Sequence, residues 1–171
     1  LAERGIAYQG YDPLYDELPT FDAVYQAIAT DVINQASRGL RVVYAVPGSP
    51  LVAEKTVPLI CEQAAAAGLT AGVLPGMSFL DVMYAKLAID PQSGLTIIDA
   101  NEIARIPHAD TALIVTQVYN RQVASNAKLS LMEFLPDDYE IVLCLHLGLE
   151  SEQICRIPLY ELDRRQDIDH L

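Results

Sequence analysis

Helix-like and strand-like patterns alternate along the first half of this 171-residue chain. Residues 20–39 ("TFDAVYQAIATDVINQASRG") place apolar side chains three and four residues apart, which predicts an amphipathic helix. Thr20 is a suitable cap for its start, and Gly39 for its end. The next segment, 41–46 ("RVVYAV"), is short and apolar, as expected of a strand that is buried on both faces. This alternation favours an α/β fold with a largely parallel sheet.

The alternation continues through the following fifty residues. Pro58 sets the start of the next helix near Val57, because proline is tolerated in the first turn of a helix and destabilises its interior. Ser78, with Asp81 three residues later, is a capping-box-like start for another helix. The elements expected here are a helix to Gly68 with Thr56 as its candidate cap, a strand at 69–74, and a helix from 78 that ends before Asp90.

The second half of the sequence has a more mixed pattern, closer to α+β. The expected elements are strands at 94–100 and 111–116, a short helix at 101–105, a helix at 123–135, and two strands within 140–148 and 152–162. The last two strands are antiparallel if the short "LESE" joins them directly. The pattern changes around "DPQSG", a turn-forming stretch. We therefore expect an N-terminal α/β lobe at residues 1–92 and a C-terminal mixed α+β lobe at 93–171.

Charge and composition restrict the partners. Acidic residues outnumber basic residues 23 to 11, and the formal net charge is −12. Such a charge repels phosphate backbones and anionic lipid, so neither nucleic acid nor a membrane surface is an expected partner. About half of the residues are apolar, which permits a sizeable core. The chain begins without a signal peptide and has no apolar run of membrane-spanning length, so a cytoplasmic location is expected.

The cysteines and histidines do not have the spacing of a metal site. No C-x-x-C pair exists among the three cysteines, Cys61, Cys144 and Cys155, and we expect small core thiols in a reducing compartment. No Glu or His partner at metal-ligand spacing accompanies the three histidines, His108, His146 and His170. We therefore expect no metal, and we expect His146 to be a strand histidine with its hydrogen bonds satisfied.

The stretch "VPGSP" (46–50) lies where a strand is expected to lead into a helix, which is where ligands bind in open α/β sheets. Gly48 would let a ligand approach the backbone closely, and Pro47 and Pro50 would stiffen the loop. The N–H groups of Ser49 and of the residues after Pro50 are candidate donors to a carboxylate or a hydroxyl group. "LPGMSF" (74–79) is a second Pro-Gly turn, and it follows the next expected strand. Both a plain structural turn and a ligand loop fit this spacing.

Other nucleotide and hydrolase signatures are missing. The chain has no G-x-x-x-x-G-K-[ST] phosphate loop, no G-x-G-x-x-G fingerprint and no G-x-S-x-G elbow. A metal-dependent nucleotide pyrophosphohydrolase would need carboxylates three and four residues apart along paired helices, and no expected helix carries them. Polar side chains beyond the strand at 111–116 fit two interpretations, a capped helix start or a second ligand-facing wall; they are Gln117, Asn120, Ser125, Asn126 and Lys128.

Four separated blocks, in order, cover nearly the whole chain and are similar to one family. They are "VVYAVPGSPLVAEKTV", "SFLDVMYAKLAIDPQSGLTIIDA", "TQVYNRQVASNAKLSLMEFLPDDYEIVL" and "IPLYELDR". Together they resemble the tetrapyrrole (corrin/porphyrin) methylase family. Within it they look like the branch that forms the N-terminal domain of MazG-type proteins, upstream of a nucleoside triphosphate pyrophosphohydrolase domain.

The resemblance implies two α/β lobes with S-adenosylmethionine in the cleft between them and S-adenosylhomocysteine as the product. The family's "GDP" motif corresponds to Gly48-Ser49-Pro50, and its "PGxSS"-like turn begins at Pro75. The strand end Thr116–Tyr119 would line the cofactor from the second lobe. The implied cofactor-binding residues are Pro47, Gly48, Ser49, Pro50, Val52, Gly76, Ser78, Phe79, Gln117, Val118 and Tyr119. The family also begins with a strand and a G-x-G-P-G loop, both missing from this chain, and usually continues beyond "ELDRRQDIDHL".

The implied chemistry is methyl transfer from a sulfonium to a carbon or nitrogen. Such a displacement depends on alignment and a shielded cleft more than on a strong base, so no acid–base pair is expected to stand out. The catalytic residues and the acceptor stay open. The alternative is a non-catalytic ligand-sensing or regulatory module attached to a pyrophosphohydrolase. The resemblance also implies a homodimer, for which we single out the tyrosines Tyr8, Tyr11 and Tyr15 as interface residues.

Overall fold

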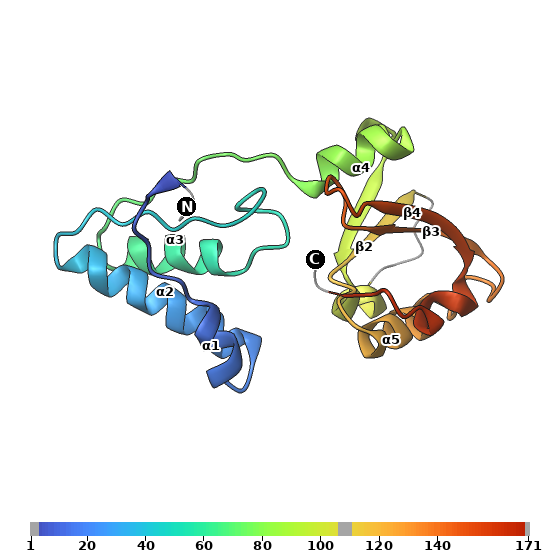
Figure 1. Ribbon diagram of the computed structural model, residues 1–171, viewed down its shortest axis with the longest axis horizontal. Coiled ribbons are helices and arrows are strands. Elements are labelled where there is room, and N and C mark those ends of the chain that lie inside the picture. The colour runs from blue at the N-terminus through green and yellow to red at the C-terminus, as the bar shows by residue number, and fades with distance from the viewer. Residues whose placement is uncertain (1–3, 106–110, 170–171) are drawn as a thin grey trace. The chain divides into compact units, whose positions relative to one another are not determined.

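The computed structural model describes residues 4–105 and 111–169, with the side chains of 104 and 105 left aside (Figure 1). Contacts divide the chain into two compact units, Leu1–Met77 and Ser78–Leu171, and each has its own hydrophobic core. The division therefore comes before helix α4 (Phe79–Leu87), whereas the sequence pattern places a lobe boundary after residue 92. The ion pair between Lys86 in α4 and Glu152 (2.7 Å) ties this helix to the second unit.

Three helices form the framework of the first unit: α1 (Asp12–Glu17), α2 (Phe21–Ser37) and α3 (Thr56–Ala66). The predicted cap of α2 is confirmed, because Thr20 Oγ1 accepts a hydrogen bond from the Ala23 N–H (3.2 Å). Helix α3 starts slightly earlier than expected. Thr56 is the buried first residue of the helix and not its cap. The N-cap residue is Lys55, which makes no side-chain capping hydrogen bond, and the carboxylate of Glu54 accepts from the Thr56 N–H (2.7 Å).

The core of the first unit lies between α2, α3 and the extended segment 41–46. Val24, Ile28 and Val32 on α2 are buried. Val42 and Tyr44 pack against them, whereas Val43, between them, is 79% exposed. Segment 41–46 is therefore covered on one face, and the prediction that it is buried on both faces is wrong.

The parallel sheet predicted for the first lobe is not found among its described residues. Segments 41–46 and 69–74 are extended, but neither is assigned as a strand, and no backbone hydrogen bonds join them. A strand is defined by a hydrogen-bonded neighbour, and local apolar pattern alone does not supply one. The two segments are therefore extended, as expected of strands, but they are not paired with each other in a sheet.

The second unit contains the two strands expected at 94–100 and 111–116, and the structure pairs them in parallel. Strand β1 (Leu95–Asp99) pairs with β2 (Ala112–Thr116) in parallel, from Leu95 opposite Ala112 to Asp99 opposite Thr116. Helix α5 (Arg121–Leu131) follows β2 and packs against two 3-10 helices, η3 (Ala100–Arg105) and η4 (Leu159–Arg164). A shorter 3-10 helix, η2 (Pro91–Ser93), precedes β1. The core between α5 and its neighbours is formed by Ile103, Ala124, Ala127, Leu159 and other buried apolar residues.

The second unit also contains an antiparallel hairpin. Strands β3 (Glu140–Leu145) and β4 (Gln153–Pro158) pair from Glu140 opposite Pro158 to Leu145 opposite Gln153, which confirms the predicted antiparallel arrangement. Helix α4 has the capping box predicted from the sequence: the Ser78 N–H donates to Asp81 Oδ2 (2.8 Å), and Ser78 Oγ accepts from Leu80 N–H (3.0 Å). Within the described part of the chain, no helix combines the length and the hydropathy needed to cross a membrane.

Candidate functional site

The two Pro-Gly turns of the first unit meet at their glycines. A Cβ atom placed on Gly76 would lie 2.4 Å from the carbonyl oxygen of Gly48 and 3.7 Å from Ser49 Cα. Real Cβ atoms do not approach a backbone oxygen so closely, so any side chain at 76 would force the turns apart. The two Pro-Gly turns, 28 positions apart in the sequence, are therefore adjacent in the structure, and their backbones are in contact.

The conformation of the first turn depends on a second special position. Gly48 has φ of +73°, a left-handed value that residues with a Cβ rarely adopt. The chain then makes a β-turn from Ser49 to Val52, closed by the Val52 N–H donating to Ser49 O (3.2 Å), with Pro50 in the second position, where proline is favoured. Ala53 follows with φ of +55°. Left-handed conformations at non-glycine residues gather where structure constrains the backbone, and functional loops are one such place.

The backbone donors of this loop differ in their availability. The Val52 N–H is engaged in the β-turn, so it is not one of the free donors expected after Pro50. No hydrogen bond is formed by the N–H of Ser49 or Leu51 with any described residue. Leu51 is 62% exposed, and Ser49 is half-buried. Two neighbouring N–H groups of this loop therefore stay available to an acceptor such as a carboxylate.

Ser78 and Phe79 belong to the start of α4 in the second unit. The hydroxyl oxygen of Ser78 is occupied by the Leu80 N–H, and Ser78 is buried. Phe79 is half-buried as the first residue of the helix. The structure therefore assigns Ser78 a definite capping role, and contact between either residue and a cofactor stays a prediction.

The second predicted wall lies where β2 ends. Gln117 has φ of +63°, and this left-handed residue turns the chain from β2 toward α5. Val118 and Tyr119 pack against the core of the second unit, and Gln117 is exposed. Asp99 ends β1 opposite Thr116, and its Oδ1 accepts from the backbone and side-chain N–H groups of Asn101 (both 2.9 Å). The carboxyl edge of the parallel pair therefore carries the carboxylate of Asp99.

The polar side chains after β2 mostly hold α5 in place. Asn120 caps the helix by accepting from the Val123 N–H (2.8 Å), and Asn126 accepts from Gln122 (3.1 Å). Lys128 pairs with Asp163 (2.7 Å), and this hydrogen bond lowers the pKa of Asp163. The structure therefore favours the capped helix start over a ligand wall for Asn120, Asn126 and Lys128, and it leaves Gln117 as the exposed polar residue at the strand end.

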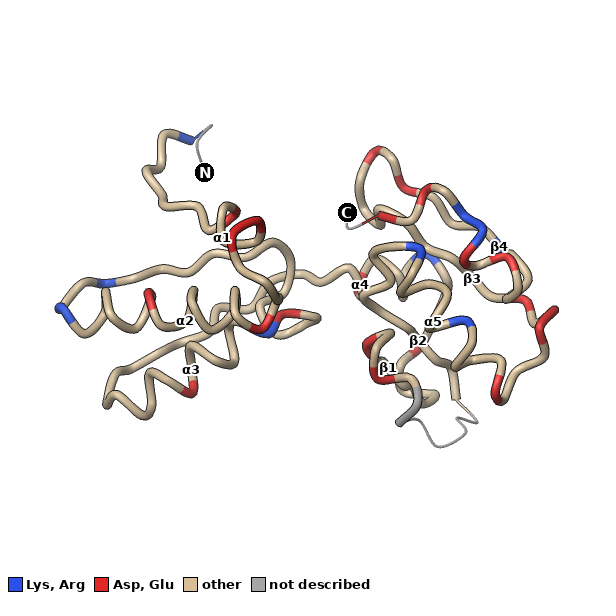
Figure 2. The backbone as a smooth tube through the Cα atoms, turned by 90° about the horizontal axis from the view of Figure 1, so that it is seen from below, with Lys and Arg blue, Asp and Glu red and all other residues tan. Residues whose placement is uncertain are grey.

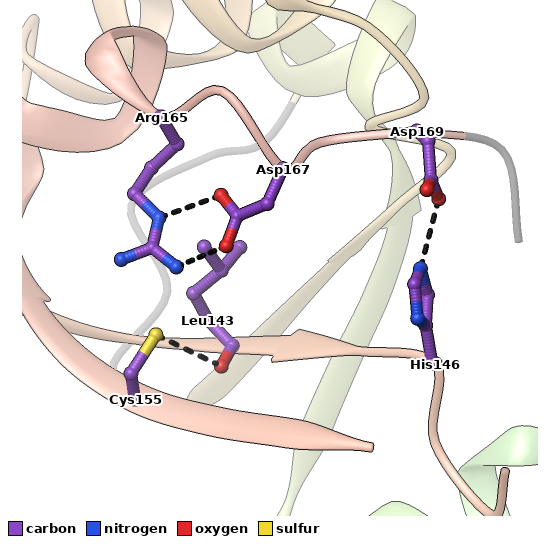
Figure 3. A network of polar contacts seen from close by, with 6 residues as sticks. All are labelled: Leu143, His146, Cys155, Arg165, Asp167 and Asp169. Atoms are coloured by element: carbon purple, nitrogen blue, oxygen red, sulfur yellow. Dashed lines mark hydrogen bonds and ion pairs between the residues drawn. The ribbon is translucent and has the colours of Figure 1, made fainter. Parts of the chain in front are cut away.

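A chain of hydrogen bonds links His146 to two residues that the sequence pattern did not connect with it. Nδ1 of His146 is 2.9 Å from Ser151 Oγ. Its Nε2 is 3.0 Å from Asp169 Oδ1, the contact drawn in Figure 3. The prediction that His146 is a satisfied histidine is confirmed, although it lies just after β3 with φ of +52°. Only the folded hairpin brings the three residues together, so spacing could not reveal them.

The order serine, histidine, carboxylate is also that of a hydrolase triad, which additionally needs N–H donors for an oxyanion. In the same turn the Gly148 N–H donates to Glu152 Oε2 (2.9 Å), and the Leu149 N–H donates to His146 O (3.0 Å). Both donors are committed to the turn. The two hydrogen bonds of His146 therefore have a structural role: they hold Ser151 and Asp169 to the end of strand β3.

Tyr11 is not the exposed interface residue that the sequence suggested. Its hydroxyl donates to Asp31 Oδ2 (2.6 Å), and its ring contacts Tyr44 with centroids 6.3 Å apart. Burial, followed by the hydrogen bond to Asp31, raises the pKa of Tyr11 to about 12. Tyr8 and Tyr15, in contrast, are 60% and 46% exposed. Tyr11 therefore joins α1 to α2 within the first unit.

The described residues contain no group of three His, Cys, Asp or Glu side chains arranged to hold a metal ion. Cys61, Cys144 and Cys155 are free thiols, half-buried rather than fully buried as expected. Burial raises the pKa of the Cys144 thiol, which disfavours the reactive thiolate.

A family model matches nearly the whole chain. Residues 2–163 match the family described as Tetrapyrrole (Corrin/Porphyrin) Methylases. A relative from Bacillus subtilis (strain 168), named "Uncharacterized protein YabN", is 42% identical over 165 residues. The match covers 94% of this chain and 33% of that protein, so the chain spans about a third of the length of this curated relative.

Two solved structures have a similar fold. The uroporphyrin-III-C-methyltransferase from Thermus thermophilus gives a TM-score of 0.65 at 19% identity, over 84% of this chain and 67% of that chain. A putative cobalamin synthesis related protein (CobF) from Corynebacterium diphtheriae gives 0.56 at 15% identity, over 80% of this chain and 60% of that chain. At these identities the likeness establishes the α/β fold that the sequence predicted.

Proposed function

The chain belongs to the tetrapyrrole (corrin/porphyrin) methylase family, and from this membership we propose that it binds S-adenosylmethionine at the paired Pro-Gly turns and transfers a methyl group to a small acceptor. Family membership supports the general assignment of a methyltransferase-like domain, and one solved structure of similar fold is named a methyltransferase. The cofactor, its position and turnover by this chain are the proposed parts.

The observation that carries the proposal is the contact between Gly48 and Gly76. A Cβ at 76 would lie 2.4 Å from Gly48 O, so the backbone surface formed by the two turns exists only because both residues lack side chains. The free N–H groups of Ser49 and Leu51 are suited to the carboxylate of an amino-acid-derived cofactor. The turns therefore fit this cofactor, and Pro47 and Pro50 would keep the cost of ordering the loop small.

The roles of the chain's own residues follow from the chemistry required. When bound, S-adenosylmethionine would supply a methyl group on a sulfonium, and its transfer to a carbon or nitrogen nucleophile of the acceptor would break the methyl–sulfur bond and release S-adenosylhomocysteine, without need of a strong base. The Pro-Gly turns of the first unit would orient the cofactor through their backbone. Ser78 would act indirectly, by fixing the start of α4 through its capping hydrogen bonds. Positioning of this kind is the larger part of catalysis in such displacements.

A matched pair of substitutions tests the proposal. In Gly76→Ala the added methyl group would collide with Gly48 O, and we expect at least a tenfold loss of S-adenosylmethionine affinity in calorimetric titration. Gly72→Ala, four residues earlier, has no atom within 4 Å of the added Cβ and no left-handed φ, so it should bind as the natural chain does. Circular dichroism would establish that both variants are folded.

Two results would count against the proposal. If the folded natural chain binds neither S-adenosylmethionine nor S-adenosylhomocysteine, the cofactor assignment is wrong. If Gly76→Ala binds as tightly as Gly72→Ala, the cofactor lies elsewhere. Binding without methyl transfer to any acceptor would favour a second candidate function.

That second candidate is a ligand-sensing module attached to a nucleoside triphosphate pyrophosphohydrolase, as in the MazG-type branch. The observation that favours it is length, because the chain spans only about a third of the Bacillus subtilis relative, which leaves room in that protein for other domains. A homodimer, with Tyr8 and Tyr15 as exposed candidates for the interface, is proposed with it. Sedimentation of the chain with and without S-adenosylhomocysteine would test the dimer.

A further inference from the structure

A surface hollow of about 470 Å³ lies between helices α2 and α3 of the first unit. Its lining residues are Asp22, Tyr25 and Gln26 from α2, Glu54 and Lys55 from the loop before α3, and Pro58, Leu59 and Glu62 from α3. We propose that this hollow, which we call the α2–α3 groove, is a docking site for an arginine-bearing segment of a partner protein. All of the lining residues belong to one unit, and none of them is a predicted cofactor-binding residue.

The groove follows from the way the two helices pack. Val24 and Ile28 of α2 are buried, and Ile60 of α3 packs against them. This contact brings the neighbouring residues of each helix together at the surface, where polar side chains remain in water. The helices are also joined directly, because Gln63 Nε2 donates to Gln26 Oε1 (3.1 Å). The groove is therefore fixed by helix packing within one folded unit.

The groove carries more negative than positive charge. Three carboxylates line it, those of Asp22, Glu54 and Glu62, against one cation, Lys55. The side chains of Asp22 and Glu62 are exposed, and neither forms a hydrogen bond or an ion pair within the described residues. Glu54 accepts from the Thr56 N–H through Oε1 (2.7 Å). No ion pair joins Lys55 to these carboxylates in the described part of the chain, so they stay available to a cationic partner.

Carboxylates of the second unit differ from those of the groove, because cations of their own unit already pair with them. The pairs are Glu152 with Lys86 (2.7 Å), Asp163 with Lys128 (2.7 Å), Glu140 with Arg156 (2.8 Å) and Asp167 with Arg165. A cationic partner would have to displace an existing cation there, and it would gain little by doing so. Asp22 and Glu62 have no such cation to displace.

Aromatic and apolar surface lies beside the charges of the groove. The rings of Phe21 and Tyr25 stack, with centroids 6.3 Å apart and an angle of 14° between their planes. Phe21 is 50% exposed, Pro58 is exposed and Leu59 is half-buried. A guanidinium group can stack on an aromatic ring, and its hydrocarbon stem can cover apolar surface while its N–H groups donate to carboxylates. Lysine has no planar face, so the groove suits arginine better than lysine.

The spacing of the carboxylates favours a peptide segment over a single compact cation. Within the described residues, no three acidic side chains are arranged to hold one metal ion. Glu54 and Glu62 are eight positions apart in the sequence, which is about 12 Å along a helix axis. Cationic side chains spaced along one segment can contact both carboxylates, whereas a compact cation contacts only one of them.

The charge of the whole chain favours a basic partner over a second copy of this chain. The net charge is −12, and acidic residues outnumber basic residues within positions 1–77. Figure 2 shows acidic positions on α1, α2 and α3. Such a surface raises the association rate of a basic partner and repels a partner of the same sign.

The test uses hexa-arginine amide and hexa-lysine amide as probes, because the two peptides carry equal charge on different side chains. Calorimetric titration into the whole chain at about 50 mM and about 300 mM salt measures both affinities. We expect hexa-arginine to bind at least about threefold more tightly than hexa-lysine at the lower salt, because only the guanidinium stacks on the rings. Both affinities should fall at the higher salt.

Two double variants of equal net charge locate the binding. Asp22→Asn/Glu62→Gln removes two carboxylates of the groove, and Asp137→Asn/Asp138→Asn removes two exposed carboxylates of the second unit. We expect the groove variant to bind hexa-arginine at least about fivefold more weakly than the control variant. Lys55→Gln should bind it about twofold more tightly than the natural chain, because the substitution removes a like charge. Circular dichroism would establish that all of these variants are folded.

A further variant separates the rings from the charges. Tyr25→Leu leaves every carboxylate of the groove in place, so hexa-lysine should bind it as it binds the natural chain. The preference for hexa-arginine over hexa-lysine should disappear, because the stacked pair of Phe21 and Tyr25 is lost. An unchanged preference would show that arginine does not use these rings, which contradicts the proposal.

Other outcomes would identify a different occupant or none. Equal affinities of the two double variants would mean that hexa-arginine responds to net charge alone. Tighter binding of spermine than of hexa-arginine would identify a small polyamine as the occupant, and loss of a dimer in Asp22→Asn/Glu62→Gln, seen by sedimentation, would identify a second copy of the chain. Failure of the natural chain to bind either peptide at low salt would also overturn the proposal. No measurement in this series involves S-adenosylmethionine, so the proposed function is tested separately.

Discussion

At the scale of single residues, two glycines carry the candidate site for different reasons. Gly48 is needed for its left-handed backbone, with φ of +73°, and Gly76 is needed for close approach, since a Cβ there would lie 2.4 Å from Gly48 O. The dipeptide Pro-Gly predicts a turn in both places. It does not show which glycine is needed for a left-handed backbone and which for close approach, because the close approach depends on a residue 28 positions away.

Tyr11 offers a test of the packing of the first unit. Tyr11→Phe removes the hydrogen bond to Asp31, and we expect the chain to lose about 1 kcal/mol of unfolding free energy at neutral pH. Because folding raises the pKa of Tyr11 from 10.0 to about 12, its contribution is complete below pH 10 and is lost as the pH rises toward 12. The difference in stability between the natural chain and the variant should therefore shrink over that range. Urea unfolding at about pH 8 and about pH 11 would measure it.

Tyr8→Phe is the matched control for this test, because Tyr8 is 60% exposed. We expect it to change stability by less than about 0.5 kcal/mol. The pKa values of Tyr15 and Tyr44 are also raised, mainly by burial. The natural chain and Tyr11→Phe will therefore both lose stability at high pH. The prediction therefore concerns the difference between the natural chain and Tyr11→Phe, and a difference that stays constant with pH would contradict it.

At the scale of elements, the start of α4 connects local sequence to the site. Ser78→Ala removes the hydroxyl that accepts from the Leu80 N–H, and we expect a loss of about 1 kcal/mol in unfolding free energy. If the cap only positions the helix, cofactor affinity should fall little once the variant is folded. Ser93→Ala, at an exposed residue of η2, is the control and should change neither quantity. A large loss of affinity at unchanged stability would instead place Ser78 in contact with the cofactor.

The outcome for the elements shows which sequence signals are reliable. The caps of α2 and α4, the strands β1 and β2 and the β3–β4 hairpin are confirmed, because each depends on contacts between residues near in sequence or on a strong apolar pattern. The strands expected at 41–46 and 69–74 are not, because pairing needs a neighbour that the pattern does not specify. Helix α1 was not expected: it has only six residues and no buried side chain, so it carries no clear periodic signal.

At the scale of the whole molecule, we expect the net negative charge to favour cationic ligands over neutral or anionic ones. S-adenosylmethionine carries one more positive charge than S-adenosylhomocysteine, and the chain has a net charge of −12. We expect the affinity of S-adenosylmethionine, relative to that of S-adenosylhomocysteine, to fall as salt rises from about 20 mM to about 200 mM. Calorimetric titration of both ligands at the two salt concentrations would measure the ratio. A ratio independent of salt would mean that the field of the protein does not reach the sulfonium.

The sequence by itself determined the family, the order of most helices and strands, the turns that the candidate site uses and the negative charge that surrounds it. These are properties of composition, of local pattern and of motifs that are contiguous in the chain. Only the tertiary structure decided that Gly48 and Gly76 touch, that Val52 uses its N–H within a turn, and that Lys128 and Asn120 support α5. The reason is physical: a side chain's partners are set by folding, which brings together residues whose separation in the sequence carries no information about their distance in space.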